Sequence, residues 1–143
     1  MIAFFSKFKE VAERETRVIT LPQGMMGLPA GEYALVEFYC DEVDCDCRRV
    51  ILQIWSAAKP GVTLATFNYG WESKGFYIDW MHGDRDLGRE MHGLSVELFG
   101  QQSKFTPQLR ALVEMVIRED PAYVERLKRH YQMLKAGLQR VVR

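Results

Sequence analysis

Two segments that favour β-strand flank a short stretch that contains every cysteine of the chain. Residues 32–40 predict a strand with Ala34, Val36, Phe38 and Cys40 on one face, and residues 49–56 form a nearly continuous apolar run. Patterns of this kind are typical of neighbouring strands in an antiparallel sheet. We therefore expect the cysteine stretch to be the turn between two paired strands, and the rest of the chain has to fold around that pair.

The spacing of the cysteines, Cys40-x4-Cys45-x-Cys47, suits a metal site. In an extended chain, side chains two residues apart point to the same side, so Cys45 and Cys47 can direct both sulfurs to one point. The residues between Cys40 and Cys45 are long enough to fold back and return the third sulfur. Zinc takes four ligands, with bonds of roughly 2.3 Å to sulfur and 2.0–2.1 Å to nitrogen, so three thiolates and one histidine would satisfy it.

His130 is the leading candidate for the fourth ligand. It lies beside the apolar face of the last predicted helix, and a helix docked on the sheet can close a site that the turn alone cannot. His82 and His92, which flank a loop rich in glycine and charged residues, are alternatives, as are a carboxylate and water. A position open to water would allow Lewis-acid chemistry.

Other interpretations of the cysteines compete with zinc. They can be reduced, partly buried thiols with no ligand, because free cysteine is among the most buried residue types. They can also form a redox pair, in which Cys40 bonds to Cys45 or Cys47; a bond between Cys45 and Cys47 alone would be strained. Calcium fits less well, since the acids around the cysteines lack the order of an EF-hand. In the zinc interpretation, Arg48 and Arg49 partly offset the charge of the thiolates.

The remaining patterns complete a single α+β domain over residues 1–143. Residues 2–15 predict an amphipathic N-terminal helix, short strand patterns separated by turns predict an antiparallel sheet, and two helices in series follow it. Five main strands are expected at residues 32–40, 49–56, 62–69, 76–81 and 94–99, with a short strand at 16–21 and helices at 106–118 and from 121 onward.

The charge and hydropathy of the chain exclude several classes of partner. Nineteen basic and nineteen acidic residues cancel, so the sequence has no general electrostatic footprint for nucleic acid. No apolar run approaches the ~20 residues that cross a bilayer, and the apolar stretch at the N-terminus is too short for a signal peptide. We expect a cytoplasmic protein whose thiols stay reduced.

An aromatic-rich segment offers a possible surface for a protein partner. We expect these residues to form a hairpin, in which aromatic side chains mainly pack against one another across the strands. The alternative is a recognition surface, because aromatic residues are also enriched at protein interfaces. The residues concerned are Tyr69, Trp71, Phe76, Tyr77 and Trp80.

The stretch FYCDEVDCDCRRV, together with KRHYQ in the last helix, resembles a family of uncharacterised bacterial proteins with a YC-x4-CDCRRV motif. The resemblance runs from about Glu13 to the last helix. It implies a bacterial, cytosolic protein and carries no activity with it.

Two classes of function follow from these patterns. The first is a zinc-stabilised domain that acts as a binding or interaction module, since the chain has a cysteine cluster and none of the common catalytic motifs. The second is an enzyme, either a metal-dependent hydrolase or a thiol redox protein. The number of protein ligands on the metal separates them, because four give a closed structural site and three leave room for catalysis.

Overall fold

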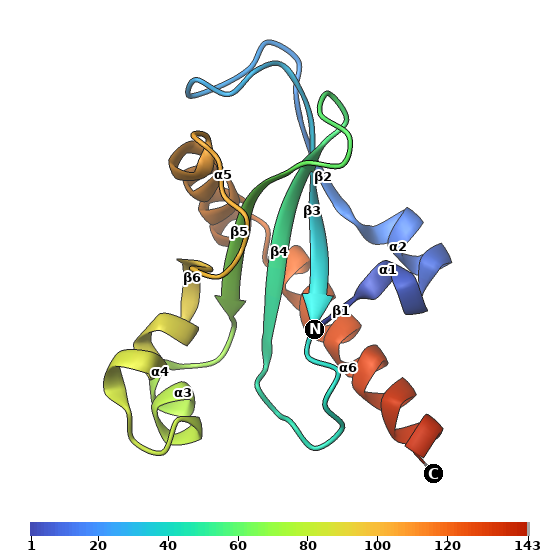
Figure 1. Ribbon diagram of the computed structural model, residues 1–143, viewed down its shortest axis with the longest axis vertical. Coiled ribbons are helices and arrows are strands. Elements are labelled where there is room, and N and C mark those ends of the chain that lie inside the picture. Colours follow the sequence, from blue (N-terminus) through green and yellow to red (C-terminus); the bar gives the residue numbers. More distant parts are fainter. Residues whose placement is uncertain (143) are drawn as a thin grey trace.

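The computed structural model describes residues 1–142 and confirms the predicted α+β class, with an antiparallel sheet, an N-terminal helical segment and two C-terminal helices (Figure 1). The strands are β1 (Ile2–Ala3), β2 (Arg17–Leu21), β3 (Gly31–Tyr39), β4 (Arg49–Ser56), β5 (Thr63–Gly70) and β6 (Gly93–Val96). The helices are α1 (Phe4–Lys7), α2 (Lys9–Glu15), α3 (Lys74–Trp80), α4 (Arg85–Met91), α5 (Thr106–Glu119) and α6 (Pro121–Val142).

The pairing of β3 with β4 lies at the centre of the sheet, as the sequence predicts. The strand order is β1-β3-β4-β5-β6, every pairing is antiparallel, and β2 also pairs with β3. The register of β3 on β4 runs from Tyr33 opposite Ser56 to Phe38 opposite Ile51. The cysteine stretch is therefore the connection between the two central strands.

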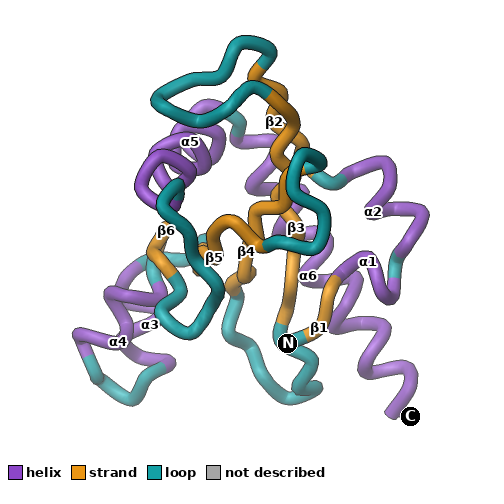
Figure 2. The backbone as a smooth tube through the Cα atoms, turned by 45° about the horizontal axis from the view of Figure 1, so that its top comes forward, coloured by secondary structure: helices purple, strands orange, loops and turns teal. Residues whose placement is uncertain are grey.

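The two faces of the sheet differ in what covers them. Leu35 and Tyr39 on β3 are fully buried in a core that also contains Leu109 of α5 and Leu127 of α6. We call the face of the sheet that carries Leu35 and Tyr39 the inner face. Figures 1 and 2 show α5 and α6 behind the sheet, α1 and α2 at one side of it, and α3 and α4 at the other. On the opposite, outer face, Ala34 and Phe38 are only half-buried.

The predicted N-terminal helix is broken in two and preceded by a short strand. Phe8 separates α1 from α2 with φ −129° and ψ 60°, which are not helical angles. The break accompanies close packing of aromatic rings, since Phe4 stacks on Phe8 with ring centroids 5.1 Å apart and is itself 2% exposed. The prediction of one uninterrupted helix over residues 2–15 was therefore wrong.

The strand predicted at residues 76–81 was also wrong, and so was the aromatic hairpin built on it. These residues belong to α3, whose N-terminus is capped by Ser73 accepting a hydrogen bond from the amide of Phe76. Asp84 caps α4 in the same way. Both caps are side chains that favour helix starts, and the buried Tyr77 faces the core from a helix rather than from a strand.

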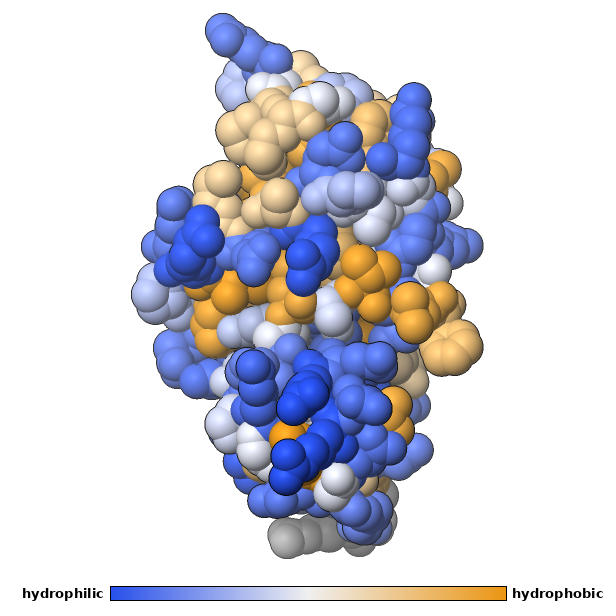
Figure 3. Space-filling model, turned by 90° about the vertical axis from the view of Figure 1, so that its left-hand side faces the viewer, coloured by the Kyte–Doolittle hydropathy of each residue, from blue (hydrophilic) through white to orange (hydrophobic). Residues whose placement is uncertain are grey.

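The last predicted strand is shorter than expected. Only the segment as far as Val96 pairs with β5, and Gly100 then closes a turn by donating its amide to the carbonyl oxygen of Glu97. The turn leaves Leu98 79% and Phe99 99% exposed. Figure 3 shows apolar side chains reaching the surface on the side of the molecule that carries β6, α3 and α4.

The two C-terminal helices form where their start signals predict. Pro107 lies in the first turn of α5, and Asp120 accepts a hydrogen bond from the amide of Tyr123 at the start of α6. Leu127, Tyr131 and Leu134 of α6 are buried, as their spacing indicates. Within residues 1–142, no helix has both the length and the apolar character that crossing a membrane requires.

We predict that Gly70→Ala lowers the free energy of unfolding by about 1–3 kcal/mol, because a Cβ atom there has no space. It would lie 2.7 Å from ring atoms of Tyr77 and closer still to the carbonyl oxygen of Met91. Urea unfolding followed by circular dichroism measures the change. Gly75→Ala is the control, since its nearest neighbour is 3.8 Å away and alanine favours helix. Equal stability of the two variants would contradict the packing.

Candidate metal centre

The fold brings the three cysteines together. Cys40 directly follows β3, and Cys45 and Cys47 precede β4 in the same connection. Their Sγ atoms all lie within 4.8 Å of one another. Tetrahedral zinc with bonds of roughly 2.3 Å would hold sulfur atoms roughly 3.8 Å apart. The cluster is therefore close to the spacing that a metal ion needs, and small side-chain movements would complete it.

Neighbouring elements hold the connection in place. The hydroxyl of Tyr77 in α3 donates to the carbonyl oxygen of Arg48 at 2.6 Å, and the amide of Arg48 donates to the hydroxyl of Tyr131 in α6 at 3.4 Å. On the other side of the cluster, Lys135 of α6 donates to the carbonyl oxygen of Glu42 at 2.8 Å. Two helices thus fix the backbone on both sides of Cys45 and Cys47, so the cluster is organised by the fold itself.

The two arginines after the cysteines have different surroundings. Arg48, at φ +45°, donates from Nε and Nη2 to the carboxylate of Asp46, and its guanidinium lies 4.6 Å from the centroid of the Phe76 ring. Its charge is therefore largely engaged by Asp46. Arg49 donates from Nη1 to Oδ1 of Asn68 at 3.0 Å and lines the cavity over the cysteines.

That cavity gives the cluster an opening to the surface. Its volume is about 260 Å³, and all three cysteines line it together with Met1, Trp80 and Arg49. Trp80 and Cys45 also line a larger neighbouring hollow. A ligand from solvent can therefore reach the cluster at the half-buried Cys40 and Cys45 without any rearrangement of the sheet.

The surroundings of Cys45 do not favour a reactive thiolate. All three cysteines are free, and Cys47 is only 1% exposed. Burial, followed by the neighbouring Cys47 and Cys40, raises the pKa of Cys45 to about 12. Reactive cysteines have a lowered pKa, because the thiolate is the nucleophile. In the metal-free protein Cys45 is thus a protonated, weak nucleophile, whereas a bound cation would favour its thiolate form.

His130 is buried, as the sequence analysis anticipates, but the structure places it with two carboxylates rather than with the cysteines. Its Nδ1 is 2.6 Å from Oε1 of Glu37 and its Nε2 is 2.8 Å from Oε1 of Glu15. The ring is fully buried and stacks on Phe4 at a centroid distance of 4.1 Å. Both nitrogens are in use, so neither is free to bind a metal in this arrangement.

The carboxylates around His130 form a buried network that the sequence analysis did not find. Glu37 is 4% exposed and also accepts a hydrogen bond of 2.6 Å from the hydroxyl of Tyr39, while Arg129 approaches Glu15 to 2.7 Å. Each ring nitrogen of His130 therefore has a carboxylate partner. The alternation of side chains along a strand could have predicted that Glu37 is buried, since it shares the inner face of β3 with Tyr33, Leu35 and Tyr39.

The other two histidines do not join the cluster. His92 Nδ1 is 2.8 Å from the carbonyl oxygen of Glu72, and His82 is exposed in the turn before α4, where it lines the hollow that Cys45 also lines. Within residues 1–142, no histidine or carboxylate completes a four-membered group with the three sulfurs at these distances. The structure therefore supplies three ligands of a possible metal site.

Comparison of the chain with known protein families, with curated proteins and with solved structures gave no match.

We predict that Glu15 makes stability depend on acidic pH. The hydrogen bond from Arg129, followed by that from His130, lowers the pKa of Glu15 from 4.5 to about 2. A carboxyl whose pKa is lower in the folded state stabilises the fold above its unfolded pKa, and this contribution is lost as the pH falls toward the folded pKa. The melting temperature of Glu15→Gln should therefore fall less than that of the parent between pH ~5 and ~2.

Glu13→Gln serves as the matched control for this measurement. Glu13 is an exposed residue of the same helix, so this variant should follow the parent. If the melting temperatures of Glu15→Gln and the parent fall equally with pH, the Glu15 contacts do not stabilise the fold.

We also predict that the folded, metal-free protein reacts slowly with iodoacetamide near neutral pH. Cys45 is protonated there and Cys47 is buried, and alkylation requires an accessible thiolate. Peptide mass spectrometry should show both residues labelled much more slowly in the folded protein than in urea. Rapid labelling of Cys45 in the folded protein would instead support a redox function.

Proposed function

We propose that Cys40, Cys45 and Cys47 bind one zinc ion, and that the protein is a zinc-stabilised binding module working in a reducing compartment such as the cytoplasm. The observation that carries the proposal is the convergence of the three Sγ atoms to within 4.8 Å at one end of the central strand pair. Three cysteines that serve only as core residues have no need to point their sulfurs at a common centre.

The donor set favours zinc over a hard cation. Thiolates prefer zinc and other soft metals, whereas calcium and magnesium prefer oxygen. In the metal-free protein, burial, followed by the neighbouring Cys47 and Cys40, raises the pKa of Cys45, and a cation among the sulfurs would favour its thiolate form. Zinc binding releases the thiol protons, so we expect its affinity to increase with pH.

Water or a ligand from solvent takes the fourth position in this proposal. His130 is held by Glu15 and Glu37, and the cavity over the cysteines gives solvent a route to the metal. The metal would tie Cys40, at the end of β3, to Cys45 and Cys47, ahead of β4. Its principal effect is therefore to stabilise the connection and the cavity that this connection borders.

A metal-dependent hydrolase is the second candidate, and the same open position supports it. Zinc with three protein ligands and a water can act as a Lewis acid. X-ray absorption spectroscopy of the zinc-loaded protein distinguishes the arrangements, because it counts sulfur and lighter ligands. Three sulfurs and one exchangeable oxygen would agree with both candidates, whereas a fourth protein ligand would exclude the hydrolase and the open fourth position.

We predict that the parent protein, purified without a histidine tag, contains close to one zinc per chain and that Cys45→Ser loses it. Elemental analysis beside protein concentration measures this. Asp44→Asn is the matched control, since Asp44 is an exposed residue of the same connection, and it should keep the metal. His130→Gln should also keep it, although that variant loses buried contacts and stability.

Chelation provides an independent measurement of the same site. Ligand bonds formed only in the folded state add to the free energy of unfolding, so a strong chelator should lower the melting temperature of the parent and of Asp44→Asn but not that of Cys45→Ser. Parent protein that contains no metal and melts at the same temperature with and without chelator would show that the three cysteines do not form a metal site.

A further inference from the structure

Around the β4–β5 turn, the outer face of the sheet carries exposed apolar side chains. On this face, Trp55 of β4 lies opposite Ala34 of β3, which in turn lies opposite Val18 of β2. Trp55 contacts the ring of Phe5 edge-on at 5.9 Å. Three of these side chains are well exposed, Phe5 at 42%, Val18 at 39% and Trp55 at 36%. A sheet normally buries its apolar side chains against another layer, and these side chains remain partly exposed instead.

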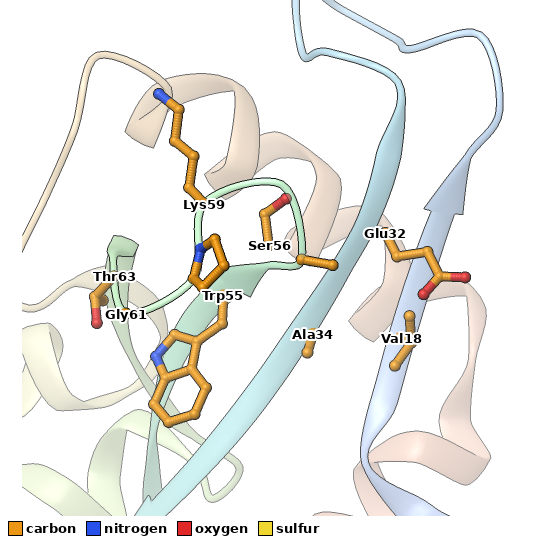
Figure 4. A pocket seen from close by; sticks show the side chains of 10 residues that line it. Val18, Glu32, Ala34, Trp55, Ser56, Lys59, Gly61 and Thr63 are labelled. Carbon is orange, nitrogen blue, oxygen red and sulfur yellow. The ribbon is translucent and has the colours of Figure 1, made fainter.

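A hollow of about 370 Å³ lies on this face beneath the β4–β5 turn. Figure 4 shows Val18, Ala34 and Trp55 along its floor, from three adjacent strands. Pro60 and Gly61 of the turn border it. The hollow gives the outer face a concave apolar surface with an aromatic side chain at its edge, which is the kind of surface that protein interfaces use.

Two opposite charges flank the hollow. Figure 4 shows Glu32 on one side and Lys59 on the other. Both are exposed, and within the part of the chain that the structure describes neither forms an ion pair. Lys59 has only a distant aromatic neighbour, the ring of Phe105, whose centroid is 5.8 Å from Nζ.

We propose that this face binds a second copy of the chain around a two-fold axis that passes near Trp55. A two-fold interface sets one surface against itself, so each residue meets a different residue of the partner. A surface with a glutamate on one side of the axis and a lysine on the other is complementary to itself: Glu32 meets the partner's Lys59, and Lys59 meets the partner's Glu32. The two Trp55 side chains pack between these ion pairs.

The charges favour this occupant over other apolar ligands. An anionic lipid surface would be repelled by Glu32, and an apolar small molecule would leave both charges without partners. A second copy satisfies both at once and covers the exposed apolar side chains. Interfaces concentrate their energy in central aromatic residues, and Trp55 holds that place here. The proposal uses no cysteine and is independent of metal binding.

Sedimentation velocity across a range of concentrations of the full-length protein tests the proposal. The parent should dimerise reversibly, and Trp55→Ser should weaken the dimer at least about tenfold, since loss of a central aromatic anchor costs an interface that much or more. A parent that stays monomeric up to roughly 100 μM, where a micromolar dimer would be well populated, would overturn the proposal. A dimer that Trp55→Ser leaves unchanged would equally overturn it.

Charge reversal tests the symmetry itself. Glu32→Lys and Lys59→Glu should each weaken the homodimer about tenfold or more, because each places like charges together twice. A mixture of the two variants should form a heterodimer as tight as the parent dimer, since both contacts become attractive again. Variants that dimerise like the parent, or a mixture that stays as weak as its components, would show that these residues do not face each other.

Glu114→Lys is the matched control for charge reversal. Glu114 is an exposed residue of α5, the helix on the inner side of the sheet, and this variant should dimerise as the parent does. Circular dichroism and melting curves establish that every variant is folded. If Glu114→Lys weakens the dimer as much as Glu32→Lys does, the interface lies elsewhere.

Discussion

The antiparallel pairing of β3 with β4 is the interaction on which the other parts of the structure depend. Its register places the cysteine connection at one end of the sheet and the β4–β5 turn at the other. It also decides which side chains face the helices. A slip of one residue would exchange the two faces, so that Leu35 and Tyr39 would turn away from α6 and the paired helices would lose their support.

The inner face carries two ionisable side chains in the middle of an apolar layer. Glu37 and His130 are both buried, and each is satisfied by hydrogen bonds. Buried polar side chains are tolerated when they are hydrogen-bonded, and removing one partner leaves the other unsatisfied. The group therefore links the sheet, the last helix and the N-terminal segment through contacts that tolerate little change. Its place in the core explains why His130 belongs to the architecture of the domain and not to the cysteine cluster.

The sequence predicted the parts of the fold whose signals are local. The strands around the cysteines follow from their short runs of apolar and β-branched residues, and the convergence of Cys45 and Cys47 follows from their spacing of two residues. The strand prediction at residues 76–81 failed because the aromatic residues Phe76, Tyr77 and Trp80 fit a short helix as well as a strand. The cap that Ser73 provides at the start of α3 favours the helix. The partners of His130 lie 93 and 115 residues away along the chain, and no local pattern shows which distant carboxylates will meet it.

The separation between Glu15 and His130 has a consequence for how the protein folds. β2 to β5 pair with near neighbours in the chain, so this part can form early, and the cysteine connection forms with it. The contact of α2 with α6 has to close a loop of 115 residues, and contacts of large sequence separation generally form late because their loop entropy must be overcome first. The cysteines would then meet while Met1, which lines their cavity, is still undocked. A metal ion would then have wider access to the cysteines during folding than in the folded protein, where Met1 borders their cavity.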